Sequence, residues 1–169
     1  MESLVFALFN TDLGWMGVVG SQRGLRGVIL PQESKEAVLG RVQGRGYTVE
    51  ICDSSSFGYL PQRIGLYFEG KKVHFPDKLD FAGASRFQQS VWQVARTIPY
   101  GETKSYGWVA FQLNSPKAAR AVGQALGRNP LPIIIPCHRV LSSDGELGGF
   151  SAGLEMKKHL LRLENAARK

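Results

Sequence analysis

The sequence predicts an α+β protein built from two domains, residues 1–84 and residues 85–169. Short apolar runs separated by turn residues fill the first third of the chain, whereas apolar residues at helical spacing dominate the second half. The charge divides at the same place, because nine basic and nine acidic residues lie in 1–84 but twelve basic and five acidic residues lie in 85–169. The net charge of +7 therefore belongs to the second domain, and such a basic domain is typical of a polyanion-binding protein.

The first domain is expected to form a small antiparallel sheet with a helix. Its apolar runs are short, and turn residues such as Asn10 and Gly20 separate them. Two later stretches carry apolar residues at helical intervals instead. In chain order we expect strands at 4–9, 14–19, 24–30 and 47–51 and helices at 33–42 and 57–68. Residues 75–84 have no clear period, and we interpret them as the linker between the domains.

The second domain is expected to be mostly helical and to contain a helix-turn-helix. Apolar residues of 87–98 fall on one helical face before Pro-Tyr-Gly at 99–101 breaks the chain. Ser105 is a candidate N-cap for the next helix. Ser115 is the expected N-cap of a second helix at 116–126, and a proline occupies the first position of that helix. Two short helices joined by a tight turn form the helix-turn-helix pattern, which also occurs in many protein cores.

The second of these helices has an unusually small surface. Alanines and one glycine occupy most of its exposed positions, and Arg120 projects from them. One interpretation is close packing against another helix. The other is an approach to the narrow minor groove of DNA, where Arg120 would enter the base stack and fill the gap left by an extruded nucleotide.

Cys137 is the candidate nucleophile of the chain. It follows the apolar segment 131–135, which we expect to be a buried strand, and it precedes His138 and Arg139. A neighbouring base and a positive charge favour the thiolate form of a cysteine. Cys52, beside an aspartate, is expected to be an inert filler. From the residues alone, an unrelated Cys/His hydrolase and a helix-turn-helix regulator remain alternatives.

The motif around Cys137 closely resembles one known family. Pro-Cys-His-Arg-Val at 136–140, Asn-Pro at 129–130 and Pro-Lys-Ala-Ala-Arg-Ala-Val-Gly at 116–123 resemble the O6-alkylguanine-DNA alkyltransferases, also called methylated-DNA–protein-cysteine methyltransferases. The resemblance covers residues 86–169 nearly continuously. It implies a DNA repair protein that flips O6-alkylguanine out of the duplex and takes the alkyl group irreversibly, in a single turnover. Repair of O4-alkylthymine is left open by the sequence.

The resemblance also implies roles for individual residues. Cys137 would accept the alkyl group, His138 would activate it as a base through an ordered water, and Glu164 would orient that histidine. Tyr106 would rotate the backbone phosphate and donate a hydrogen bond to the guanine ring. Arg120 matches the arginine that replaces the flipped base. The rest of the DNA-binding helix would comprise Lys117, Ala118, Ala119, Ala121 and Gly123.

The resemblance further implies a pocket for the flipped base. Asn129 would brace the turn before the active-site segment, and the other pocket residues would be Pro132, Val140, Phe150 and Ser151. Many relatives carry tyrosine at the position of Phe150, so a hydroxyl contact is absent in this chain. A non-catalytic protein of the same fold that only binds alkylated DNA is a further alternative, although such relatives lack the acceptor cysteine.

The sequence carries no signal for a metal, a cofactor or a membrane segment. Neither a Cys/His cluster at metal-ligand spacing nor a glycine-rich phosphate loop occurs. The apolar runs are far shorter than the roughly 20 residues of a membrane helix, and no basic leader precedes the first of them. We therefore expect a cytoplasmic monomer that needs no cofactor and binds double-stranded DNA through the minor groove.

Overall fold

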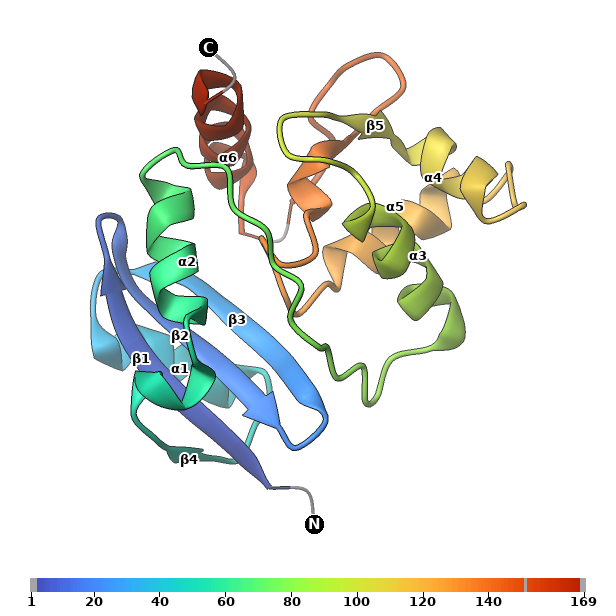
Figure 1. The fold of residues 1–169 in the computed structure, drawn as a ribbon. Coiled ribbons are helices and arrows are strands. Elements are labelled where there is room, and N and C mark those ends of the chain that lie inside the picture. Colours follow the sequence, from blue (N-terminus) through green and yellow to red (C-terminus); the bar gives the residue numbers. More distant parts are fainter. Residues whose placement is uncertain (1–2, 151, 168–169) are drawn as a thin grey trace. The chain divides into compact units, whose positions relative to one another are not determined.

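The computed structural model describes residues 3–150 and 152–167, and the chain divides into two compact units, Met1–Ala82 and Gly83–Lys169 (Figure 1). The first unit holds a four-stranded sheet with helices, and the second is mostly helical. The predicted α+β class is therefore confirmed.

The sheet of the first unit is mixed rather than purely antiparallel. Its strands are β1 (Leu4–Thr11), β2 (Gly14–Ser21), β3 (Gly24–Gln32) and β4 (Val49–Ile51), in the order β3-β2-β1-β4. The first three strands form the expected antiparallel meander, with Phe6 opposite Val19. β4 pairs with β1 in parallel, because a helical crossover returns the chain in the same direction. The expectation of an antiparallel sheet is wrong for this one strand.

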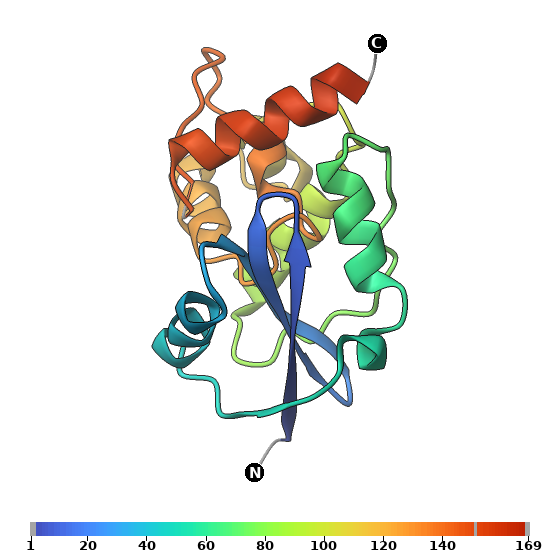
Figure 2. The same cartoon turned by 90° about the vertical axis from the view of Figure 1, so that its left-hand side faces the viewer.

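Two helices lie on opposite faces of this sheet (Figure 2). They are α1 (Lys35–Gly44) and α2 (Leu60–Phe68), and a short turn of 3-10 helix, η1 (Ser54–Phe57), precedes α2. Ser34 caps α1, since its side chain accepts from the amide of Ala37 at 3.1 Å, so the helix begins two residues later than predicted. Phe6, Val38 and Val42 are buried together where α1 meets the sheet.

The stretch before the second unit is held to the edge of the sheet. The amide of Leu25 donates to the carbonyl of Lys78, and the amide of Asp80 donates to the carbonyl of Leu25, both at 2.8 Å. The buried Asp80 carboxylate also accepts from Ser21 and Arg26. Segment 75–84, which we interpret from the sequence as the linker, is therefore hydrogen-bonded in part to β3.

The second unit begins with α3 (Arg86–Arg96), whose start is set by a capping box. Ser85 accepts from the amide of Gln88, and the Gln88 side chain accepts in return from the amide of Ser85. The apolar face of the helix is buried, and Nε1 of Trp92 donates to the carbonyl of Ala125 at 2.9 Å. This bond joins α3 to the helix-turn-helix.

The helix-turn-helix consists of α4 (Tyr106–Gln112) and α5 (Ala119–Gly127). Ser105 caps α4 as predicted, accepting from the amide of Trp108 at 2.9 Å. The prediction that Ser115 caps the second helix is wrong. Asn114 ends α4 in the left-handed region, with φ of 56°, and residues 115–118 then close a separate turn in which the amide of Ala118 donates to the carbonyl of Ser115.

The remaining elements surround Cys137. They are the two-residue strands β5 (Lys104–Ser105) and β6 (Val140–Leu141), the 3-10 turn η2 (Cys137–Arg139) and the terminal helix α6 (Leu154–Ala167). Strands β5 and β6 pair in parallel, which brings the start of α4 beside the end of η2. Within the described residues, no helix has the length and apolar character needed to cross a membrane.

Candidate active site

Cys137 follows a tight turn and not the extended strand that the apolar run predicts. The amide of Ile135 donates to the carbonyl of Leu131 at 2.8 Å, and Pro132 bridges to Ile135. Ile133 has φ of 76°, a conformation that costs a β-branched residue about 1–3 kcal/mol. The prolines at 132 and 136 have no N–H to donate to a ladder, which disfavours a regular strand here. It delivers Cys137 directly into η2.

Asn129 holds this turn and also reaches the sulfur. Its Oδ1 accepts from the amide of Leu131 at 2.8 Å, and its Nδ2 donates to the carbonyl of Ile135 at 3.0 Å and to Sγ of Cys137 at 3.1 Å. The side chain is buried, so these partners are not replaced by water. Asn129 therefore fixes both the backbone before Cys137 and the position of its thiol.

The Cys137 thiol is buried, and burial raises its pKa to about 11. The Asn129 amide, the positive charge of Lys157 and the nearby backbone N–H groups act in the opposite direction but do not outweigh burial. The expectation that neighbouring charge makes Cys137 a thiolate is therefore wrong for the free protein. The neighbouring His138 and Arg139 suggested a thiolate, but the fold encloses the sulfur, and burial disfavours its charged form.

Glu164 on α6 is the centre of a buried hydrogen-bond network. Its carboxylate accepts from Nε2 of His138 at 2.5 Å, from Nε and Nη2 of Arg139 at 2.8 and 3.1 Å, and from the amide of Gly101 at 3.0 Å. Burial opposes its charge, but the bonds from His138 and Arg139 hold the pKa of Glu164 down at about 2. The carboxylate is thus charged at neutral pH.

His138 is enclosed by the same network. Burial lowers its pKa below the usual value, and the charges of Arg139 and Lys157 act in the same direction, although Glu164 opposes them. The imidazole is therefore neutral at pH 7 and able to accept a proton. The carboxylate against Nε2 would stabilise the imidazolium that such a transfer creates.

Two buried residues around η2 were not among the site residues predicted from the sequence. Arg139 donates to Glu164 and also to the carbonyl of Ile98 at 2.7 Å, which ties η2 to the chain that follows α3. In the sequence, the signal that could have marked Arg139 as a site residue was its position directly after Cys137 and His138. Lys157, two turns before Glu164 on α6, is fully buried, and its Nζ donates to the carbonyl of Val140 at 2.9 Å. Burial lowers the pKa of Lys157 to about 8.

Tyr106 reaches the site because β5 pairs with β6. Lys104 lies opposite Val140, so the first residue of α4 stands beside the chain that leaves η2. The ring is closely packed, since a Cβ atom added at Gly148 would lie 2.4 Å from Oη of Tyr106. Burial raises the pKa of Tyr106, with a smaller contribution from Cys137, so its hydroxyl is a proton donor at neutral pH.

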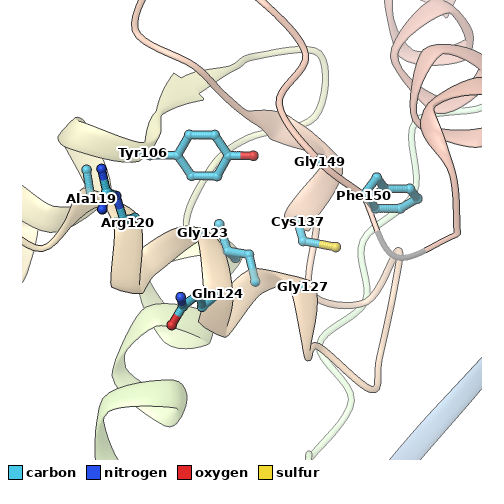
Figure 3. A pocket seen from close by; sticks show the side chains of 10 residues that line it. Tyr106, Ala119, Arg120, Gly123, Gln124, Gly127, Cys137, Gly149 and Phe150 are labelled. Atoms are coloured by element: carbon cyan, nitrogen blue, oxygen red, sulfur yellow. The ribbon is translucent and has the colours of Figure 1, made fainter.

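A cavity of about 520 Å³ is lined by Cys137, Tyr106 and residues of α5 (Figure 3). This volume falls within the range of small-molecule sites. Tyr106 lies above Cys137 in the view, with Ala119 and Arg120 of α5 on one side and Phe150 on the other. The lining residues are Tyr106, Ala119, Arg120, Gly123, Gln124, Leu126, Gly127, Cys137, Gly149 and Phe150.

The other predicted site residues that the structure describes do not line this cavity. Pro132 and Val140 are buried before and after η2. Lys117 and Ala118 precede the first residue of α5, and Ala121 is exposed on it. Ser151 lies outside the described residues. Among the described residues, no group of three or more His, Cys, Asp or Glu side chains is placed to hold a metal ion.

Comparisons with known proteins agree with this arrangement. The family model of the 6-O-methylguanine DNA methyltransferase DNA-binding domain matches residues 86–166. A methylated-DNA–protein-cysteine methyltransferase of Methanosarcina acetivorans is 36% identical over 96% of this chain and 99% of its own length. One from Mycolicibacterium paratuberculosis is 49% identical over 64% of this chain and 66% of its own length.

Solved structures show the same fold. A crystal structure of Mycobacterium tuberculosis OGT in complex with DNA has a TM-score of 0.77 at 36% identity and covers 96% of this chain and 93% of its own. The O6-methylguanine-DNA methyltransferase of Pyrococcus kodakaraensis has a TM-score of 0.73 at 27% identity, covering 95% and 99%.

Fold and site together define a protein with a buried cysteine, followed in the chain by a histidine that is hydrogen-bonded to a buried glutamate, in a cavity that a helix-turn-helix also lines. The chain belongs to the family of methylated-DNA–protein-cysteine methyltransferases.

Proposed function

We propose that this chain is a direct-reversal DNA repair protein that transfers the alkyl group of O6-alkylguanine from DNA to Cys137, once per molecule. The observation that carries the proposal is the cavity in which Cys137, Tyr106 and the small face of α5 meet. The names of the relatives, which describe transfer from methylated DNA to a protein cysteine, support it. O4-alkylthymine would undergo the same displacement if the cavity admits it.

The proposed reaction is a displacement at a saturated carbon, for which a soft thiolate is well suited. The thiol proton of Cys137 passes to His138 through a water molecule, and the sulfur then bonds to the alkyl carbon as the carbon–oxygen bond breaks. The bonding pair passes to guanine, which takes a proton from the Tyr106 hydroxyl and leaves as a neutral base. Solvent returns the His138 proton to Tyr106. The product is a thioether, which water does not readily cleave, so the protein acts once.

The burial of the Cys137 thiol explains why a base is needed. Because the pKa of this thiol is about 11, forming the thiolate at pH 7 costs on the order of 5 kcal/mol. A neutral His138 paired with the charged Glu164 is suited to take the proton, because the imidazolium formed is stabilised at once. Asn129, which donates to Sγ, stabilises the thiolate from the other side. We therefore propose these three residues as the activating group.

We propose that α5 enters the minor groove of double-stranded DNA. The minor groove is only about 6 Å wide, so a helix that approaches it closely needs small side chains, and Ala119, Gly123 and Gly127 line the cavity side of α5. Because O6 of guanine is hidden inside the duplex, the nucleotide must be flipped out, at a cost of a few kcal/mol. Arg120, exposed at the cavity mouth, would fill the gap and support the flipped state.

A labelled duplex tests the transfer. After incubation with DNA carrying O6-methylguanine labelled in the methyl group, we expect about one equivalent of label per protein, on the peptide that contains Cys137, and no turnover. Cys137→Ser should lose transfer but still bind the duplex, whereas Cys52→Ser should retain both. Continued turnover, or label elsewhere than Cys137, would contradict the proposal and favour hydrolase chemistry.

A second experiment tests the role of Arg120. Because flipping costs a few kcal/mol, Arg120→Ala should slow transfer from duplex DNA by about tenfold to a hundredfold, and transfer from a single strand much less. Arg128→Ala is the matched control, since it removes the same charge from the end of α5 without altering the cavity lining. Equal effects of the two variants would mean that Arg120 contributes only charge. Light scattering of the free and DNA-bound protein tests the expected monomer.

A further inference from the structure

Gln124 lines the cavity but has no role in the proposed reaction. Among the described residues of the lining, four carry a polar side chain, namely Tyr106, Arg120, Gln124 and Cys137, and the others are apolar or glycine. Tyr106 and Cys137 take part in the proposed transfer, and Arg120 supports the flipped nucleotide. The fourth polar side chain, that of Gln124, therefore needs an explanation of its own.

The side-chain amide of Gln124 is available to a partner outside the protein. Gln124 is exposed on α5, and within the part of the chain that the structure describes its side-chain amide makes no hydrogen bond. In Figure 3 this amide points away from Cys137, so it does not face the sulfur. A glutamine amide has two N–H donors and an oxygen acceptor, and all of them can bind a ligand here.

The neighbours of Gln124 on the surface of α5 suit an approach to DNA. Positions three and four residues apart lie side by side on a helix. At three residues these are Ala121 and Gly127, which are exposed and too small to shield the amide. At four residues they are Arg120 and Arg128, which are also exposed. The two cations can bind phosphates, which leaves the uncharged amide between them to contact a base.

The amide of Gln124 matches the one hydrogen-bond donor that the minor groove of DNA offers. This donor is the N2 amino group of guanine, whereas A·T pairs present only acceptors there. A glutamine amide binds the guanine edge with two hydrogen bonds, because its oxygen accepts from N2 and its N–H group donates to N3. At an A·T pair the amide oxygen would face another acceptor. The side chain of Gln124 therefore favours a G·C pair.

Gln124 follows Arg120 by about one turn of α5. Four residues of a helix rise by about 6 Å, which is less than two base-pair steps of about 3.4 Å each. We infer that Gln124 is a specificity-determining residue that contacts the amino group of a guanine within two base pairs of the flipped nucleotide, so that transfer depends on the sequence beside the lesion. The inference rests on the proposed function.

The test removes the amino group from the DNA and the amide from the protein. In duplexes with O6-methylguanine, each of the two base pairs on either side is in turn G·C or inosine·cytosine, because inosine lacks only the N2 amino group. For full-length wild-type protein, inosine should slow methyl transfer by about fivefold or more in at least one position. For Gln124→Met, which has a similar length and no amide, the same replacement should change the rate by less than about twofold.

Two controls isolate the contact between the amide and the amino group. Gln112→Met removes an amide from an exposed position of α4 that does not line the cavity, and this variant should discriminate as wild type does. Inosine also weakens the duplex, but equally for every variant, so the guanine-to-inosine rate ratios of two proteins are compared. Conversely, 2,6-diaminopurine opposite thymine adds the amino group to an A·T pair, and it should accelerate transfer by wild type but not by Gln124→Met.

The outcomes separate this inference from the proposed function. Wild-type rates that do not differ between guanine and inosine at any position, or full discrimination by Gln124→Met, would overturn the inference. Because Gln124 is exposed, this variant should fold, and Gln124→Ala takes its place if its urea midpoint falls. If wild-type protein places no label on Cys137, the proposed function fails. The affinity of Cys137→Ser protein for the same duplexes then still decides whether Gln124 contacts the amino group.

Discussion

Replacing Glu164 with glutamine would remove the charge from a buried carboxylate that accepts four hydrogen bonds. The amide of glutamine would turn an N–H group toward one of its donors and leave Arg139 without a counter-charge. Loss of one member of a buried ion pair typically costs about 3–5 kcal/mol. The pKa of Glu164, lowered from 4.5 to about 2, corresponds to a similar figure of about 3 kcal/mol.

We therefore expect Glu164→Gln to lose about 3 kcal/mol of unfolding free energy at pH 7, or roughly 6–12 °C in melting temperature. The pKa of Glu164 is lower in the folded protein than in the unfolded chain, so its charge stabilises the fold at any pH above the unfolded pKa. This stabilisation is lost as the pH falls toward the folded pKa. The difference between wild type and variant should thus shrink between about pH 4.5 and pH 2.

Urea unfolding followed by tryptophan fluorescence measures this difference at a series of pH values, in a Trp15→Phe background so that the signal comes from Trp92 and Trp108 of the unit that holds Glu164. Glu155→Gln is the control on the same helix. Its carboxylate is exposed, and its ion pair with Lys158, at 3.6 Å, is weak because water surrounds both groups. That variant should change stability by less than about 0.5 kcal/mol. A loss below about 1 kcal/mol for Glu164→Gln, or a loss that does not diminish in acid, would refute the argument that Glu164 is a buried, paired carboxylate.

Two further predictions concern the cavity and the thiol. Gly148→Ala should displace Tyr106 and slow transfer by about tenfold or more, because the Cβ of the new alanine would lie 2.4 Å from the tyrosine oxygen. Gly145→Ala is the control, since Gly145 has a similar positive φ but open space around it, and this variant should transfer at the normal rate. In a Cys52→Ser background, the rate at which iodoacetamide modifies Cys137 should rise about tenfold per unit from pH 7 to 9, because the thiol pKa is about 11. A plateau near pH 8 would show that the thiol is not buried as described.

The sequence by itself determined features that depend on neighbouring residues. The N-cap at Ser105, the three-stranded meander and the helical spacing of α3 follow from local backbone preferences, and the structure confirms each of them. The motif at 136–140 is contiguous, so it identified the family without knowledge of the fold. Local signals also failed where two structures compete for the same residues, as at Ser115, which closes a turn instead of starting a helix.

Only the tertiary structure decided the chemical state of the site. His138 and Arg139, which follow Cys137, suggested a thiolate, but burial keeps the thiol protonated even though Asn129 donates a hydrogen bond to the sulfur. The resemblance placed Glu164 near His138, and only the folded chain shows that Arg139 and the Gly101 amide share the same carboxylate. Lys157 was not singled out at all. Burial and contacts between residues distant in sequence set these properties, because desolvation and charge pairing depend on the surroundings in space and not on spacing along the chain.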